Sequence, residues 1–152
     1  DDMAKKAGVR GVRHVKSAFR DMMKLYGPPI NAASRHALRP ILVTAKKNIA
    51  ADPELSKSLT IKRDAKSAKA RPRHVVGPAS DSDAVRRAHF KEFGTDPHEI
   101  NGWTHPGEPP RPFLGPAYAA HGQEAINRFG EHLGKGLEKR AAKLGAKQGK
   151  PK

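Results

Sequence analysis

The sequence contains no cysteine. This absence excludes disulfide bonds, thiolate metal sites and cysteine nucleophiles. Long apolar runs are missing as well: none approaches the roughly 18 residues that a membrane-spanning helix needs, so we expect no membrane partner. Aromatic residues make up only 5% of the 152 residues, and hydrophobic residues 36%. A chain of this length suggests one domain. We expect a small core with extended arms, or a core that a neighbouring subunit completes.

Acidic residues are scarce relative to basic ones. There are 15 Asp and Glu against 30 Lys and Arg, which gives a formal net charge of +15. Such an excess bears on partners and solubility rather than on fold. It fits a nucleic-acid surface, and it fits equally a solvated surface or one that faces an acidic protein.

Helical periodicity is found at both ends of the chain. Apolar residues recur at steps of three and four over residues 12–22, and Gly27 with Pro28-Pro29 predicts the end of this first helix. A second helical pattern follows from Ile30, and Pro40 predicts a kink or a restart within it. The C-terminal helix, about 116–145, carries an apolar stripe. Its interior glycines suggest close backbone packing; they are Gly130, Gly134 and Gly136.

The middle of the chain alternates between apolar and polar residues. "KSLTIKR" and "HVVGP" predict two short strands, which would pair as a basic hairpin over about 57–77. "RRAHFKEFGT" predicts a third strand with Phe90 and Phe93 on opposite faces, one of them in the core. The Pro and Gly density of residues 96–112 predicts an extended arm with little regular structure.

This order of elements predicts an α+β fold, in which a small antiparallel sheet packs against N-terminal and C-terminal helices. We expect residues 9–146 to form this single domain. Residues 1–8 are expected to be flexible, and residues 147–152 form a basic tail. No internal repeat is present.

Motifs of catalysis and cofactor binding are not found. "GEHLGKG" lacks the spacing of a phosphate-binding loop, and neither a nucleophile elbow nor an H-E-x-x-H helix occurs. His98 and His105 flank a loop with Glu99 between them, but no third fixed ligand completes a metal site. The sequence therefore predicts a protein that is not an enzyme and that holds no cofactor or metal.

Two features suggest interaction surfaces. The predicted hairpin is densely basic, and without aromatic residues it favours protein docking or nonspecific phosphate contacts over base stacking. Its basic residues are Lys57, Lys62, Arg63, Lys66, Lys69, Arg71 and Arg73, against the single acidic Asp64. Trp103, the only tryptophan, lies in the predicted arm, where it is either a lid over the core or an anchor into a neighbour.

Three short motifs occur in order: "EFGT" at residues 92–95, "HPG" at 105–107 and "RPFLGPAY" at 111–118, followed by an amphipathic helix. Upstream lies "RPILVTAKKNIAADPELSKSLTIKR", a helix that runs into a strand. Over roughly residues 30–145 the chain resembles the gene-ten-like tail-component family of lambdoid and related long-tailed phages, also described as neck or tail-completion proteins. One turn departs from the family pattern: Asp52-Pro53-Glu54-Leu55 lacks the Thr-Gly that often precedes the leucine.

This resemblance implies a virion structural protein without catalytic residues. Such proteins form rings of six or twelve copies at the head–tail junction, where they complete, terminate or attach the tail. The implied location is the neck or tail of the virion, assembled in the host cytoplasm. The implied partners are head-closure or connector proteins, tail-tube proteins and genomic DNA passing through the lumen.

The sequence also suggests which residues make the assembly contacts. A subunit of a closed ring needs a head-to-tail interface, to which an arm is suited. The interface candidates are Phe90, Phe93, Gly94, Trp103, Pro112, Phe113 and Leu114. A basic protein that binds nucleic acid, associated with the ribosome or the nucleoid, is the alternative that the charge leaves open.

Overall fold

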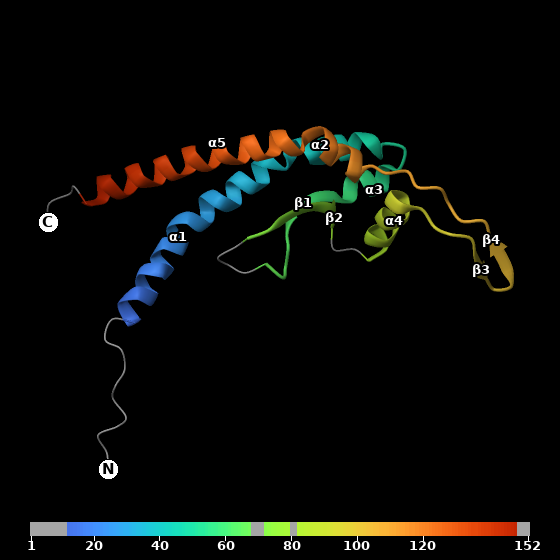
Figure 1. Cartoon of the computed structure of the whole chain (residues 1–152), viewed down its shortest axis with the longest axis horizontal. Coiled ribbons are helices and arrows are strands. Elements are labelled where there is room, and N and C mark those ends of the chain that lie inside the picture. Colours follow the sequence, from blue (N-terminus) through green and yellow to red (C-terminus); the bar gives the residue numbers. More distant parts are fainter. Residues whose placement is uncertain (1–11, 68–71, 80–81, 149–152) are drawn as a thin grey trace, which may run out of the picture.

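The computed structural model describes residues 12–67, 72–79 and 82–148. The fold is α+β, as predicted: most of the described chain is helical, and two small antiparallel sheets of two strands each complete it. The molecule is elongated, with the C-terminal end of its last helix at one extreme and a small hairpin at the other (Figure 1). The elements are α1 Val12–Ala37, α2 Arg39–Asn48, α3 Pro53–Ser58, β1 Leu59–Arg63, β2 His74–Pro78, α4 Ser82–Phe93, β3 His98–Ile100, β4 Trp103–His105 and α5 Leu114–Gln148.

The two long helices α1 and α5 pack along each other (Figure 1). The prediction that the first helix ends at Gly27 was wrong, because α1 continues through Pro28 and Pro29 to Ala37. An interior proline costs about 3 kcal/mol of helix stability. Pro29 is nevertheless buried, and the backbone of Gly136 in α5 lies directly against it. We infer that this packing offsets the cost.

The break at Pro40 was predicted correctly. α1 ends at Ala37, and α2 begins at Arg39 with Pro40 in its first turn. The first turn of a helix leaves its N–H groups without intrahelical partners, so the missing N–H of a proline costs nothing there. α2 then packs one face on α5 and on the first sheet.

The core is small. Its centre is the face of α2 on which Ile41 and Ala45 lie one turn apart, and alanines of α4 and α5 pack around it. Among the described residues, the largest fully buried side chains are Phe113, Leu55 and Leu59. Phe113 is 0% exposed, so its assignment to the assembly interface was wrong; it anchors the start of α5 in the protomer's own core.

The first sheet is the predicted basic hairpin. β1 pairs antiparallel with β2, with Leu59 opposite Pro78 and Ile61 opposite Val76. The sheet packs on the helices: β1 lies against α2, and β2 lies against α1, α3 and α4. It has two strands rather than three because residues 82–93 are helical.

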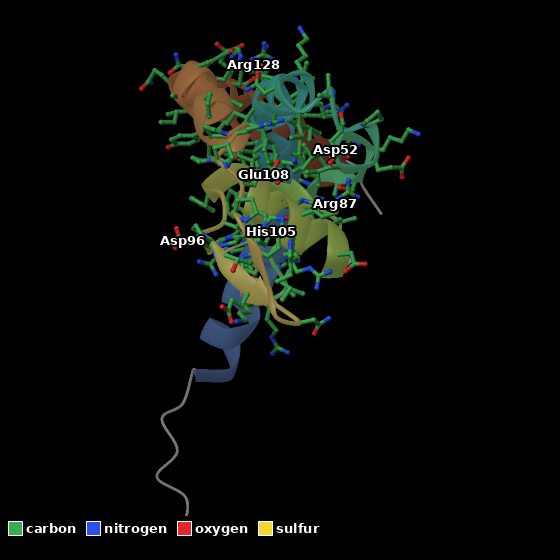
Figure 2. The ribbon with its side chains drawn as sticks, turned by 90° about the vertical axis from the view of Figure 1, so that its right-hand side faces the viewer. Asp52, Arg87, Asp96, His105, Glu108 and Arg128 are labelled. Atoms are coloured by element: carbon green, nitrogen blue, oxygen red, sulfur yellow. The ribbon has the colours of Figure 1, made fainter. Side chains whose placement is uncertain are left out.

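A short helix, α3, precedes this sheet in the turn where the sequence departs from the family pattern. The Asp52 carboxylate caps it by accepting a hydrogen bond of 3.1 Å from the Leu55 N–H. Arg87 of α4 donates to both oxygens of the same carboxylate, at 2.8 and 2.7 Å (Figure 2). The hydrogen bond from the Leu55 N–H has the largest effect on the Asp52 carboxyl, and Arg87 adds to it. Together they hold the pKa of Asp52 below its usual range. Asp52 therefore joins α3 to α4.

The predicted third strand is the helix α4, so the strand assignment was wrong. Ala84 and Ala88, one turn apart, are the residues that it buries. Small residues at a spacing of four suit a helix face in close contact, and the residues that seemed to alternate over 88–93 are in fact distributed around this helix. Phe90 and Phe93 therefore do not point in opposite directions: both are exposed, and both contact the His89 ring.

The arm has more regular structure than its composition predicted. β3 and β4 form a small antiparallel hairpin, joined by Asn101 and Gly102 with φ angles of 52° and 78°. A two-residue turn with positive φ at both positions matches the right-handed twist of the strands, and Asn-Gly is its preferred sequence. The hairpin lies at the end of the arm, away from the helices (Figure 1).

Candidate assembly surfaces

The base of the arm is fixed by Glu92, the penultimate residue of α4. Its Oε2 accepts hydrogen bonds from the backbone N–H groups of Phe113 at 2.8 Å and Leu114 at 2.9 Å, and its Oε1 accepts one from Gly115 at 2.8 Å. The first N–H groups of a helix have no intrahelical partners, and a carboxylate there also interacts favourably with the helix dipole. "EFGT" and "RPFLGPAY", two of the three motifs on which the resemblance rests, are thus in direct contact.

Two glycines bring the strands of the arm together at this base. Thr95 and Glu108 exchange backbone hydrogen bonds of 2.9 and 3.1 Å. Gly94 and Gly107 flank this bridge with φ angles of 76° and 81°. A Cβ atom on Gly94 would lie 2.7 Å from the carbonyl oxygen of Glu108, so both the conformation and the close approach require glycine.

An ion pair adds to the backbone bridge. Lys91 Nζ lies 2.6 Å from Glu108 Oε1, and the Lys91 carbonyl accepts a hydrogen bond of 2.7 Å from the Arg111 N–H. The hydrogen bond from Lys91, with its positive charge, lowers the pKa of Glu108. Both sides of the arm are thereby attached to the last turn of α4. The direction in which the arm leaves the body is therefore fixed by its base.

The tip of the arm is apolar and exposed. Trp103 is 63% exposed and Ile100, its cross-strand neighbour, 47%. The Trp103 ring meets His105 edge-on with centroids 5.8 Å apart, and the His98 ring lies 5.1 Å from the His105 ring. Of the two roles that the sequence left open for Trp103, the lid over the core is wrong. An exposed aromatic on a short hairpin fits the anchor instead.

The arm also differs from the rest of the chain in charge. Residues 96–110 contain three acidic residues, of which Glu108 pairs with Lys91, and no Lys or Arg, whereas the whole chain carries 30 Lys and Arg against 15 Asp and Glu. Asp96 and Glu99 lie exposed on or next to the hairpin. The arm is therefore an acidic and apolar projection from a strongly basic body.

A second apolar surface lies on the outer side of α4. Phe93 is 69% exposed, and Val85 and Phe90 are exposed on the same helix. The remaining interface candidates flank the arm: Pro112 is exposed and Leu114 is half-buried against the core. Except for Phe113, the interface candidates thus lie at the surface or at the base of the arm.

Several basic residues of the β1–β2 hairpin, or next to it, form contacts within the protomer. Arg73 forms an ion pair of 2.6 Å with Asp64, and Lys62 Nζ donates to the Pro78 carbonyl at 2.7 Å. Arg63 Nε donates to the Ser67 hydroxyl at 3.2 Å, and Lys57 lies 3.6 Å from Glu54. Lys66 is exposed, while Lys69 and Arg71 lie outside the described residues. Part of the positive charge of the hairpin is thus paired within the protomer, while Lys57, Arg63, Lys66 and Arg73 remain exposed to solvent.

Sequence reasoning missed a pocket between α1 and α5. It has a volume of about 380 Å³, an apolar floor and a basic edge. Arg140 Nη1 donates to the Leu25 carbonyl across the two helices at 2.8 Å. The lining residues are Leu25, Pro28, Pro29, Ala32, Gly136, Lys139, Arg140 and Lys143. More than 100 residues separate the two halves of the pocket, so no single stretch of sequence predicts it. The only local signals are the Pro28-Pro29 pair and the interior glycines of α5.

The histidines make packing contacts. His121 joins α2 to α5: its Nε2 lies 2.9 Å from the Thr44 hydroxyl, and its Nδ1 lies 2.8 Å from Glu124, which Arg128 also contacts. The hydrogen bonds from His121 and then Arg128 lower the pKa of Glu124. His98 and His105 do come together, but the described residues contain no group of three side chains suited to a metal ion.

Comparison with known proteins gave no match to any family model, curated protein or solved structure. Within the described ranges, no helix combines the length and apolarity that crossing a membrane requires.

Proposed function

We propose that this chain is a structural subunit of a tailed-phage virion, which forms a ring at the head–tail junction in a neck, tail-completion or tail-terminator role. The observation that carries the proposal is the arm. The residues of "EFGT", "HPG" and "RPFLGPAY", on which the resemblance rests, meet at its base, and an exposed tryptophan lies at its tip. These residues hold a projection in place.

The physical requirements of a ring support this role. A closed ring uses a heterologous interface, in which two different surfaces of each subunit meet. Exposed apolar patches on soluble proteins mark sites of association. This protomer exposes apolar side chains at the tip of the arm and on α4, and it has an apolar pocket between α1 and α5. A subunit with a small core gains stability from such contacts.

The positive charge fits neighbouring acidic protein surfaces or DNA in transit. Strong gripping of sliding DNA would hinder its passage, so we place most of the excess charge outside the lumen. A ring in which residues 57–73 line the channel would contradict it.

A nucleic-acid-binding role is the second candidate, favoured by the net charge of +15. It requires duplex affinity that falls steeply with salt, because binding releases condensed counterions. The acidic arm and the internally paired hairpin favour protein contacts instead. The nucleic-acid-binding role would be supported if the monomeric chain bound duplex DNA near physiological salt and formed no ring.

The test is assembly. Native mass spectrometry and negative-stain electron microscopy of the purified chain should reveal closed rings of six or twelve copies. Immunogold labelling of tailed particles from the source host should place the chain at the neck or tail. A chain that stays monomeric at every concentration and never enters particles would refute the proposal.

A further inference from the structure

We propose that the β3–β4 hairpin of one copy docks on a second copy of this chain, with Trp103 seated in the pocket between α1 and α5. This inference rests on the proposed ring and names its subunit interface. The pocket lined by Leu25, Pro28, Pro29, Ala32, Gly136, Lys139, Arg140 and Lys143 is called the basic pocket from here on.

The hairpin has the properties of an anchor. Trp103 and Ile100 are exposed side by side, so docking would remove a continuous apolar patch from water. A tryptophan buries roughly 150–250 Å², and such residues dominate interface energetics. The bridge between Thr95 and Glu108 fixes the arm before docking, which reduces the entropy lost on binding.

The basic pocket has the shape and lining that this anchor needs. Its volume of about 380 Å³ falls in the range of about 300–1,000 Å³ that is usual for ligand pockets. Its apolar lining comes from Leu25, two prolines and an alanine of α1, and Gly136 lets α5 approach Pro29 closely at this point. An indole fits an apolar recess of this kind.

Charge makes the two surfaces complementary. Asp96 and Glu99 accompany Trp103 on a segment without Lys or Arg, while Lys139 and Lys143 lie exposed at the edge of the pocket. Opposite charges around an apolar centre set the register of a complex and exclude wrong partners. A second groove of about 310 Å³, which includes Ile126 and Phe129, has no Lys or Arg among the described residues that line it. Charge therefore favours the basic pocket.

Geometry requires that the partner be a different copy. The hairpin and the C-terminal part of α5 lie at opposite ends of the molecule (Figure 1). Gly136 lies 22 residues after the start of α5 at Leu114, which corresponds to about 33 Å at 1.5 Å per residue, and the arm extends the other way. A hairpin therefore cannot reach its own pocket. Two different surfaces then meet at each contact, which is the heterologous interface that a ring needs.

The absence of cysteine and the single tryptophan make the test direct. Ile100 lies on the same face of the hairpin as Trp103, so Ile100→Cys in one chain and Ala32→Cys in another should form an intermolecular disulfide under mild oxidation. The matched pair, Ile100→Cys with Ile126→Cys, should not. Trp103 emission in the wild-type chain should move to shorter wavelength, and iodide quenching should fall, as concentration rises through assembly. Cross-linking through Ile126 instead, or a tryptophan that stays exposed in the assembly, would overturn the inference.

Substitutions give the energetic test, read by sedimentation velocity. Trp103→Ala should raise the dissociation constant between copies at least tenfold, while Trp103→Phe, which keeps an aromatic anchor, should raise it less. Asp96→Lys and Lys139→Glu should each weaken association, and together they should restore part of it. Unaltered circular dichroism verifies the fold of each variant. Rings that form equally well with Trp103→Ala would refute this interface and leave the proposed function standing, whereas a wild-type chain that never associates would refute both.

Discussion

Glu92 stabilises the first turn of α5 from outside that helix. Its two carboxylate oxygens accept three backbone hydrogen bonds, from Phe113, Leu114 and Gly115. A side chain of the same helix usually provides such a cap. Here the cap comes from α4, so a single residue links the end of one helix, the base of the arm and the start of another.

Glu92→Ala should lower the free energy of unfolding by about 1–2 kcal/mol, because it leaves those N–H groups near the buried Phe113 without a protein partner. Glu92→Gln should cost less, since the amide keeps one acceptor oxygen. Urea denaturation followed by circular dichroism measures both. The control is Glu138→Ala, which removes an exposed carboxylate from α5, the helix that Glu92 caps. Equal losses at the two sites would contradict this account of Glu92.

His36 of α1 stacks on His132 of α5, with ring centroids 4.6 Å apart. Burial lowers the pKa of His36 below its ordinary value of 6.5, and the nearby His132, Arg39 and Arg128 lower it further, against a small opposing effect of Glu131. As the pH falls, His36 therefore binds a proton more readily in the unfolded chain than in the folded chain. The contribution of neutral His36 to the free energy of unfolding is fully present above about pH 6.5, and it is lost as the pH falls below that value.

The free energy of unfolding should thus decrease between pH 7.5 and pH 5.5, a range above the ordinary titration of carboxylates. His36→Gln should make this decrease smaller. His74, whose pKa is also lowered by burial and by Arg35 and Arg63, should retain part of it. Urea midpoints at the two pH values measure the effect, with His89→Gln as the control for loss of an exposed histidine. An unchanged slope in His36→Gln would count against the stacked pair as its source.

At the scale of elements, the packing of α1 on α5 determines where α1 ends. The sequence interpretation weighed Pro28 and Pro29 as local helix breakers, but their contact with α5 overrides that preference. The interior glycines of α5 are not equivalent. A Cβ atom on Gly136 would lie 3.1 Å from the Cβ of Pro29, whereas one on Gly130 or Gly134 would meet nothing within 4 Å.

Gly134→Ala should therefore stabilise the protein by up to about 1 kcal/mol, which is the helix propensity that alanine gains over glycine. Gly136→Ala should gain less, because its new methyl group presses on Pro29. Denaturant unfolding compares the two substitutions, which lie two residues apart in one helix. A gain at Gly136 equal to that at Gly134 would show that no close contact exists there.

Elements with a strong local pattern could be predicted from the sequence, and those set by distant contacts could not. The alternation in β1 and β2, the break at Pro40 and the stripe of α5 each predicted the correct element. α4 was mistaken for a strand because Ala84 and Ala88, the small residues that it buries, carry little hydrophobic signal. The hairpin of the arm had a local signal, Asn101-Gly102, which the surrounding prolines outweighed. The basic pocket has no local signal, since α1 and α5 form it together.

At the scale of the whole molecule, charge and apolar surface are divided between the two ends. The β3–β4 hairpin of the acidic arm lies at one extreme, and the basic pocket lies between the two long helices on the other side of the core (Figure 1). A protomer with two different and complementary surfaces associates head to tail, so each added copy presents a free hairpin and a free pocket. Closure into a ring is what ends such growth.

Two defective variants should reveal this polarity when they are mixed. Trp103→Ala removes the anchor and keeps the pocket, whereas Ala32→Glu places a carboxylate in the pocket and keeps the anchor. Each variant alone should remain monomeric in native mass spectrometry. Their equimolar mixture should form 1:1 dimers and nothing larger, because only one hairpin and one pocket in each pair can still meet. The wild-type chain under the same conditions should grow past the dimer, since both surfaces of every copy are intact. Larger assemblies in the mixture, or no dimer at all, would mean that the hairpin and the pocket are not the two halves of one interface.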